Sequence, residues 1–312
     1  MAVFKRKLEA SLTGGDAAGN GHVANGAGAY DGLTLANGAR MTGDVARVAK
    51  VYSAGPLLDA VQQAHIFPDS KTFVDMPMRE DPEVVLKAFE DLPADAKKDP
   101  RELRAFVEKW FLEAGSDLEP WTPPDVVQQP RRLMEIADPD MRAWALELNK
   151  LWAVLGRRQS PSVKENPQRH SCLPREYPMV VPGGRFREMY YWDTYWIVRG
   201  LLVCDMVQTA TGLVLNSLDQ VQHFGFCPNG NRVYYLDRSQ PPLLSAMVKA
   251  IHDATGDRGF LERALPILEK EYDFWMDPAC GRLVQLPERP PGIGVGTPAG
   301  LPMAAVRSGG EQ

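Results

Sequence analysis

Residues 182–195 read PGGRFREMYYWDTY, and this stretch joins a polar, glycine-containing turn to the most apolar part of the chain. The paired glycines Gly183 and Gly184 let the backbone turn tightly and approach another molecule closely. Apolar residues dominate from Tyr191 to Val207, which predicts that helical structure follows the turn. The stretch therefore indicates a ligand-accessible loop mounted on a helical scaffold.

Helical patterns extend from this segment toward the N-terminus. Asp-Pro pairs at 81–82, 99–100 and 138–139 each precede apolar residues spaced three and four apart. Aspartate caps a helix well, and proline fits its first position because no N–H is needed there. We expect three helices, closed by Pro93, Gly115 and Gly156, with the tryptophans on their apolar faces, Trp110 and Trp152, packed in a core.

The pattern also continues toward the C-terminus. Two helices are expected near 193–220, and a third from Ser239 to about Thr255, ended by Gly256. A last helix covers 257–276, where Pro266 should kink or restart it. The expected fold class is therefore all-α over residues 44–276.

Both ends differ from this helical region. Residues 13–43 are rich in Gly, Ala, Asn and Asp, which predicts that 1–43 form a disordered leader. Residues 277–312 contain six prolines, seven glycines and no aromatic residue, which predicts an unstructured tail. The expected organisation is a helical domain between two disordered tails.

Composition excludes several classes of function. The net charge of −5 argues against nucleic-acid binding, which needs clustered Lys and Arg. The sequence contains no CxxC pair, HExxH motif or Walker A motif, so we expect neither a metal nor another cofactor. Charged residues interrupt the apolar stretch at 191–207, which argues against a membrane span. No signal peptide is visible, so an intracellular location is the default expectation.

Two polar segments contain the candidate binding residues. In the first, Arg185 offers a planar fork of donors, while Trp192 beside Asp193 suits a sugar. An aromatic ring covers the apolar side of a pyranose, and a carboxylate accepts hydrogen bonds from adjacent hydroxyls. The alternative from these residues alone is that Tyr190, Tyr191 and Trp192 are core residues and that Asp193 caps the next helix.

The second segment, residues 228–242, reads PNGNRVYYLDRSQPP. Asn229, Arg238 and Gln240 could supply a second set of partners for sugar hydroxyls. The alternative is a loop whose polar groups bind its own backbone, with Ser239 acting only as a helix cap.

These two segments resemble the α,α-trehalase family. Residues 182–195 fit the first family signature at every fixed position, and 229–244 and the run DSKTFVD at 69–75 are also similar to the family. The resemblance covers roughly residues 50–276. It implies an α/α toroid, in which six helix pairs form a closed ring, of which this chain would hold an incomplete part.

The resemblance also implies an activity and a set of site residues. Trehalases of this type hydrolyse the α,α-1,1 bond of trehalose with inversion and without a metal. The positions that bind substrate hydroxyls in the family match Arg185, Trp192, Asp193, Asn229, Arg238, Ser239 and Gln240. Trehalose is therefore the expected partner, and Asp193 is expected to bind it without acting as the general acid.

The expected catalytic carboxylates are not found in this sequence. Inversion uses two carboxyl groups about 6.5–9.5 Å apart, one as acid and one as base. The family motif that holds the acid, similar to ESGWDFSSRW, does not occur, and PERP at 287–290 does not reproduce the family's Arg-Pro-Glu element. We therefore expect a truncated chain that is inactive alone.

Two other interpretations remain open: a sugar-binding or regulatory protein without catalysis, and a non-functional product. An incomplete ring should also leave apolar helix faces uncovered, which predicts self-association.

Overall fold

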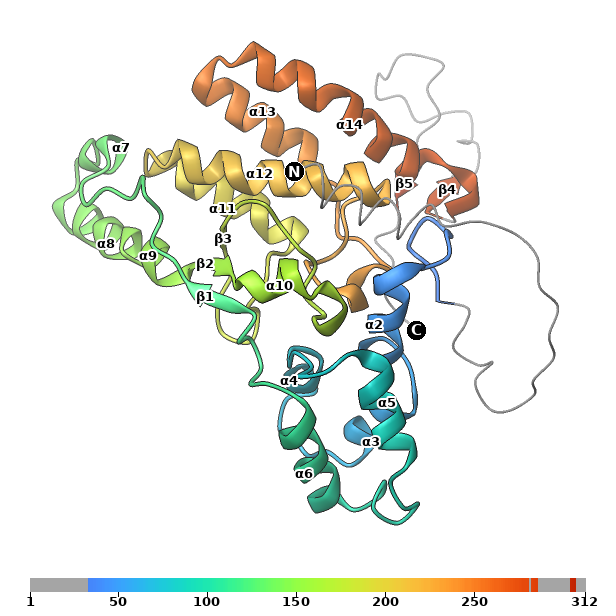
Figure 1. Cartoon of the computed structure of the whole chain (residues 1–312). Coiled ribbons are helices and arrows are strands. Elements are labelled where there is room, and N and C mark those ends of the chain that lie inside the picture. The colour runs from blue at the N-terminus through green and yellow to red at the C-terminus, as the bar shows by residue number, and fades with distance from the viewer. Residues whose placement is uncertain (1–32, 281, 286–303, 307–312) are drawn as a thin grey trace, which may run out of the picture.

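The computed structural model describes residues 33–280, 282–285 and 304–306. Figure 1 shows a group of short N-terminal helices next to a layer of longer C-terminal helices, with a small sheet between them. The polar loops of interest therefore lie between two helical groups, each with its own hydrophobic core.

The N-terminal group packs short helices around buried aromatic side chains. Phe73 and Phe111 have ring centroids 5.0 Å apart, and Tyr52 contacts both rings. All three side chains are almost fully buried, so this cluster fixes how the helices pack. The helices are α2 (Gly43–Tyr52), α3 (Pro56–Gln63), α4 (Lys71–Val74), α5 (Pro82–Glu90) and α6 (Pro100–Trp110).

Helices begin at all three Asp-Pro pairs, as the sequence predicts. Asp99 accepts a hydrogen bond from Arg101 N at 2.8 Å, so it caps α6. Asp138 likewise accepts from two backbone N–H groups of α8 (Pro139–Asn149). Asp81 makes no such cap, because its carboxylate binds the guanidinium of Arg169 at 2.7 Å.

The middle of the chain contains strands, which corrects the all-α expectation. Strands β1 (Leu118–Pro120), β2 (Gly156–Gln159) and β3 (Met179–Val180) form an antiparallel sheet in the order β1-β2-β3. A Cβ at Gly156 would lie 2.0 Å from the Trp121 carbonyl oxygen, so only glycine fits where β2 begins. The remaining elements here are α7 (Arg131–Met134), α9 (Leu151–Leu155), α10 (Pro161–Glu165) and the 3-10 helix η1 (Pro167–Arg169).

Helices α8 and α9 show an exposed apolar face. The sequence predicts one helix from Asp138 to Leu155, but the structure has two, separated at Lys150. The helical apolar spacing is present, yet Trp144 is 59% exposed and Val154 is 62% exposed. Trp110 and Trp152, the tryptophans of the predicted apolar faces, are partly buried and pack against the two hydrophobic cores. Met141, Leu148 and Leu151 are exposed on the same two helices.

The C-terminal layer consists of four helices, of which the second and third each pack against all the others. The helix expected from Ser239 begins only at Leu244, because Pro241 and Pro242 disfavour helical conformation in the residue before each. Pro266 lies on an exposed face of the last helix, which continues through it without restarting. The elements are α11 (Tyr191–Val203), α12 (Val207–Phe224), η2 (Val233–Tyr235), α13 (Leu244–Thr255) and α14 (Arg258–Met276).

Some residues in the expected tails have regular contacts. Residues 1–32 lie outside the described residues, but Ala36 N donates to Leu236 O at 2.8 Å, and Leu35 and Met41 are buried. Hydrophobic burial and backbone pairing thus order the end of the expected leader. Within 277–312, the described elements are η3 (Pro278–Cys280) and two paired strands, β4 (Leu283–Gln285) and β5 (Ala304–Val306).

None of the helices described here combines the length and the apolar character needed to cross a bilayer.

Candidate functional site

The two polar segments meet through their backbones. We call residues 182–190 loop A and residues 228–240 loop B. Tyr191 N donates to Asn229 O at 3.1 Å, and Asn231 N donates to Met189 O at 2.9 Å. This antiparallel contact is why candidate residues more than thirty positions apart in sequence lie together.

A buried ion cluster lies beneath both loops. Arg232 of loop B is fully buried, and its Nη1 lies 2.7 Å from Asp117 Oδ2. Its Nε lies 3.2 Å from Asp75 and 3.3 Å from Glu188 of loop A. Lys71 Nζ pairs with the same two carboxylates, at 2.9 Å from Glu188. The buried ion cluster is thus Lys71, Asp75, Asp117, Glu188 and Arg232, with a formal charge of −1.

The charges in this cluster support each other. Burial alone would lower the pKa of Arg232, but Asp117, Asp75 and Glu188 together raise it well above its usual value. Ser171 Oγ accepts a further hydrogen bond from Arg232 Nη1 at 2.9 Å. A buried guanidinium needs this degree of pairing, because an unpaired charge in a protein interior is very costly.

Three tyrosines connect the buried ion cluster to the surface. Tyr234 OH donates to Asp75 Oδ1 at 2.7 Å, and Tyr190 OH donates to Glu188. Tyr190 and Tyr235 share a hydroxyl contact at 3.0 Å. Burial, reinforced for Tyr190 and Tyr234 by the negative charge of Glu188, raises the pKa of these phenols above its ordinary value. They remain neutral donors under ordinary conditions.

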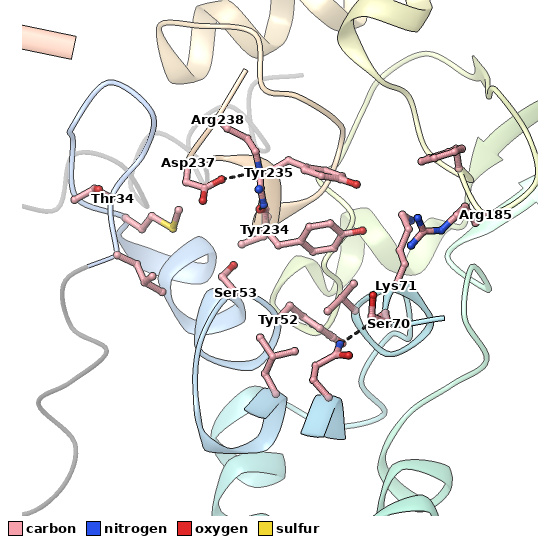
Figure 2. Close-up of a pocket in the computed structure, with 17 residues that line it drawn as sticks. Thr34, Tyr52, Ser53, Ser70, Lys71, Arg185, Tyr234, Tyr235, Asp237 and Arg238 are labelled. Carbon is pink, nitrogen blue, oxygen red and sulfur yellow. Dashed lines mark hydrogen bonds and ion pairs between the residues drawn. The ribbon is translucent and has the colours of Figure 1, made fainter. Parts of the chain in front are cut away.

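A pocket of about 430 Å³ opens where these loops face the N-terminal helices. Figure 2 shows Tyr234, Tyr235 and Arg238 of loop B facing Tyr52 and Ser53, with Arg185 of loop A at another edge. Ser53 Oγ and Arg238 Nε are buried without a hydrogen-bond partner among the described residues. The pocket lining therefore combines aromatic surface with polar side chains such as Ser53, Asp237 and Arg238.

Arg185 lies at the tip of a tight turn. Gly183 and Phe186 exchange two backbone hydrogen bonds, at 3.0 and 3.1 Å, and both glycines have positive φ. The Arg185 guanidinium binds Asp69 through Nε at 2.7 Å and Nη2 at 2.6 Å. Its side chain stays 50% exposed and lines the pocket. Its charge is thus held at the edge of the pocket without being buried.

A second group of candidate residues surrounds the start of α11. Trp192 is 43% exposed, and its backbone N–H donates to Gln240 Oε1 at 2.8 Å. Asp193 is partly buried, which raises the pKa of its carboxyl group. Asn229 joins this group through the backbone contact of its carbonyl with Tyr191. Trp192, Asp193, Asn229 and Gln240 therefore gather at one helix end, and none of the four lines the pocket.

The alternative that residues 190–193 have a core and capping role agrees with the structure only in part. Tyr190 and Tyr191 are buried, as a core role predicts, but Trp192 is exposed. Asp193 lies in the first turn of α11 and not at its N-cap, which is Tyr190.

Arg238 and Ser239 bind backbone groups of loop B and its flank. Arg238 Nη2 donates to Tyr234 O at 3.0 Å, and its Nε lies 3.1 Å from Asp237 Oδ1 without hydrogen-bond geometry. Ser239 is buried, and its hydroxyl donates to Cys227 O at 2.6 Å. Ser239 therefore stabilises the loop internally, as the alternative proposed, although it does not cap α13.

Sequence reasoning missed a further buried contact. Tyr191 OH donates to Glu271 Oε1 of α14 at 2.7 Å and accepts from the backbone N–H groups of Leu243 and Leu244. Burial raises the pKa of Glu271 to about 7, although the hydrogen bond from Tyr191 opposes that shift. This contact joins α11, α13 and α14 directly behind Trp192 and Asp193.

The residues that sequence reasoning missed fall into two groups, those inside the recognised motifs and those outside them. Lys71, Asp75, Glu188 and Arg232 lie inside the motifs at 69–75, 182–195 and 228–242, so their positions were marked although their ionic role was not. Asp117 and Glu271 lie outside any motif and could not be found from sequence. Within the described part of the chain, no group of three or more His, Cys, Asp or Glu side chains could hold a metal ion.

Comparison with known proteins gives a consistent family match. The family model described as Trehalase matches residues 65–299, which starts later and ends later than the 50–276 expected. The trehalase of Homo sapiens is 46% identical over 229 residues, covering 73% of this chain and 39% of that protein. The trehalase of Bombyx mori is 44% identical, covering 74% of this chain and 40% of that protein.

A solved structure is also similar. Neutral trehalase from Saccharomyces cerevisiae has 41% sequence identity and a TM-score of 0.30, covering 31% of this chain and 19% of that one. The chain thus spans about 40% of the length of the curated relatives described above.

Removing one carboxylate of the buried ion cluster should strongly destabilise the fold. Asp117→Ala removes the shortest ion pair of Arg232, and we expect the free energy of unfolding to fall by about 3–5 kcal/mol. Glu119→Ala is the matched control, because Glu119 pairs with Arg158 at the surface and its loss should cost at most about 1 kcal/mol. Urea denaturation measures both, and similar small losses would contradict the role given to the cluster.

Glu271 should make stability depend on pH. Its folded pKa of about 7 exceeds the ordinary 4.5, so its stabilising contribution is full below about pH 4.5 and is lost as the pH rises to about 7. Relative to Glu271→Gln, the wild type should lose up to about 3 kcal/mol across that range. Tyr191 and Cys227, its titratable neighbours, have pKa values raised well above this window.

Unfolding free energies measured at pH values spanning that window provide the test. Glu269→Gln, on an exposed part of the same helix, is the control and should leave the wild-type profile unchanged. Parallel wild-type and Glu271→Gln profiles would contradict the assignment.

Proposed function

Because the chain belongs to the trehalase family, we propose that loops A and B bind the hydroxyl groups of trehalose, the disaccharide that the family hydrolyses. The observation that carries this proposal is the backbone pairing of the two loops above one buried ion cluster. That arrangement fixes candidate residues from two distant motifs relative to each other.

The chemistry of the exposed residues supports a sugar ligand. Trp192 offers an exposed aromatic face, which suits the C–H side of a pyranose ring. Asp193, Asn229 and Gln240 lie at the same helix end, and carboxylate and amide side chains can exchange hydrogen bonds with hydroxyls. We propose that these four residues and the two pocket-lining arginines, Arg185 and Arg238, bind the sugar, while Ser239 supports loop B from within.

We further propose that the 312-residue chain does not hydrolyse trehalose by itself. The family's acid-bearing motif does not occur in the sequence. The buried carboxylates next to the loops, Asp75, Asp117 and Glu188, are held by Arg232 and Lys71 and are poorly placed to exchange protons with a substrate. Binding groups without a free acid and base supply no proton transfer to the glycosidic oxygen.

Binding and hydrolysis are separable by measurement. We expect calorimetry to detect trehalose binding, and an assay for glucose to detect no release above a protein-free control. Asp193→Asn should weaken binding about tenfold or more, the typical effect of losing a charged acceptor. Trp192→Ala should also weaken it, whereas Trp144→Ala, which removes an exposed tryptophan on α8, should not.

Either of two results would count against the proposal. Affinity that is unaffected by the Trp192 and Asp193 variants would remove the assigned site. Release of glucose at an appreciable rate would show that a complete acid–base pair is present.

The exposed apolar face of α8 and α9 supports a proposal about assembly. Met141, Trp144, Leu148, Leu151 and Val154 are all exposed on these two consecutive helices. An apolar face of this extent promotes association in water, because burial removes it from solvent. We propose that the chain self-associates through this face.

Sedimentation velocity over a range of protein concentrations tests that assembly. The wild type should form concentration-dependent oligomers, and the double substitution Trp144→Gln, Leu148→Gln should shift it toward monomer by removing exposed apolar area. Val84→Gln, at an exposed apolar residue of α5, is the control and should not change the distribution. A wild type that is monomeric at all concentrations would refute the proposal.

A further inference from the structure

Residues 69–75, which read DSKTFVD, contact loop A at two separate points. In the buried ion cluster, Lys71 pairs with Glu188 at 2.9 Å. At the surface, Asp69 binds Arg185 through both carboxylate oxygens. Residues two apart in one segment thus contact residues three apart in the other, and the two segments lie more than a hundred residues apart in sequence.

Asp69 is also held by a hydrogen bond within its own segment. Its Oδ1 accepts a hydrogen bond from the backbone N–H of Lys71 at 2.9 Å, at the start of α4. The hydrogen bonds from Arg185 and from Lys71 N hold the pKa of Asp69 below its ordinary value, so it is ionised over the neutral range. A carboxylate tethered to the backbone in this way presents a fixed acceptor to the half-exposed Arg185 side chain.

The pair contributes orientation more than stability. Asp69 and Arg185 are 36% and 50% exposed, and exposed ion pairs contribute little to folding. A planar fork held by two parallel hydrogen bonds, however, has a defined plane and direction. Asp69 uses two of the five N–H donors of Arg185, which leaves three for a ligand.

We propose that Asp69 is a positioning residue, which orders the guanidinium of Arg185 at the pocket edge before a sugar hydroxyl reaches it. This inference rests on the proposed function, since Arg185 is one of the residues assigned to trehalose. An exposed arginine at a turn tip otherwise samples many rotamers, and ordering it on binding reduces affinity. Asp69 removes most of that cost while leaving the fold unchanged.

Trehalose affinity in a double-mutant cycle provides the first test. Asp69→Asn should weaken binding about three- to tenfold, the loss expected when one flexible side chain must be ordered by its ligand. Arg185→Ala should weaken it further, and Asp69→Asn combined with Arg185→Ala should be no worse than Arg185→Ala alone. Glu119→Gln, which frees the exposed Arg158 from a comparable pair at 2.9 Å, is the matched control and should leave affinity unchanged.

A ligand-independent measurement separates this inference from the proposed function. The Arg185 Nε–H resonance, assigned by its absence in Arg185→Lys, should exchange slowly with water in the wild type and quickly in Asp69→Asn, with the same melting temperature in both. If the wild type fails to bind trehalose, the proposed function fails, and this resonance still decides whether Asp69 orders Arg185.

The inference is overturned by any of three results. The first is an Arg185 Nε–H that is as protected from exchange in Asp69→Asn as in the wild type. The others are a trehalose affinity unchanged by Asp69→Asn, and affinity losses of the two single variants that simply add in the double variant. A large drop in the melting temperature of Asp69→Asn would assign the pair a structural role instead.

Discussion

A fully buried arginine sets the main constraint on this fold. Arg232 lies where loop B, loop A and the segments containing Asp75 and Asp117 converge, and it contacts a carboxylate from each of the other three. None of these charges is tolerated alone in a protein interior, so each segment must be in place for the others to be stable. The buried ion cluster therefore connects the N-terminal helices to the C-terminal layer, and its charges stabilise one another.

The buried ion cluster also explains why one motif contains both structural and exposed residues. In PGGRFRE, Glu188 belongs to the buried ion cluster, whereas Arg185 three residues earlier is half exposed and lines the pocket. In NGNR, Arg232 is buried while Asn229 reaches the partly exposed start of α11. These two motifs thus combine a buried ionic contact with accessible residues, which composition alone cannot separate.

The sequence predicted local features well and long-range ones poorly. The starts of α5, α6 and α8 follow from Asp-Pro chemistry, which depends only on neighbouring residues. The sheet was missed because β1, β2 and β3 are too short to show an alternating pattern, and their pairing depends on distant partners. The apolar face of α8 was correctly recognised as a stripe, but periodicity cannot say whether a stripe is covered.

For the candidate residues, too, the sequence indicated local properties better than long-range contacts. Local sequence marked Arg185, Trp192 and Asp193 as accessible, and they are at least partly exposed. It could not indicate that the Ser239 hydroxyl turns inward to Cys227 O, or that Tyr191 binds Glu271 across eighty residues. Because Tyr191 OH also accepts the first N–H groups of α13, the start of α11 is fixed from behind by a buried carboxylate and from the side by Gln240. Trp192 and Asp193 can therefore remain accessible and still be held in place, since the buried Tyr191–Glu271 contact stabilises their helix end from outside the proposed binding surface.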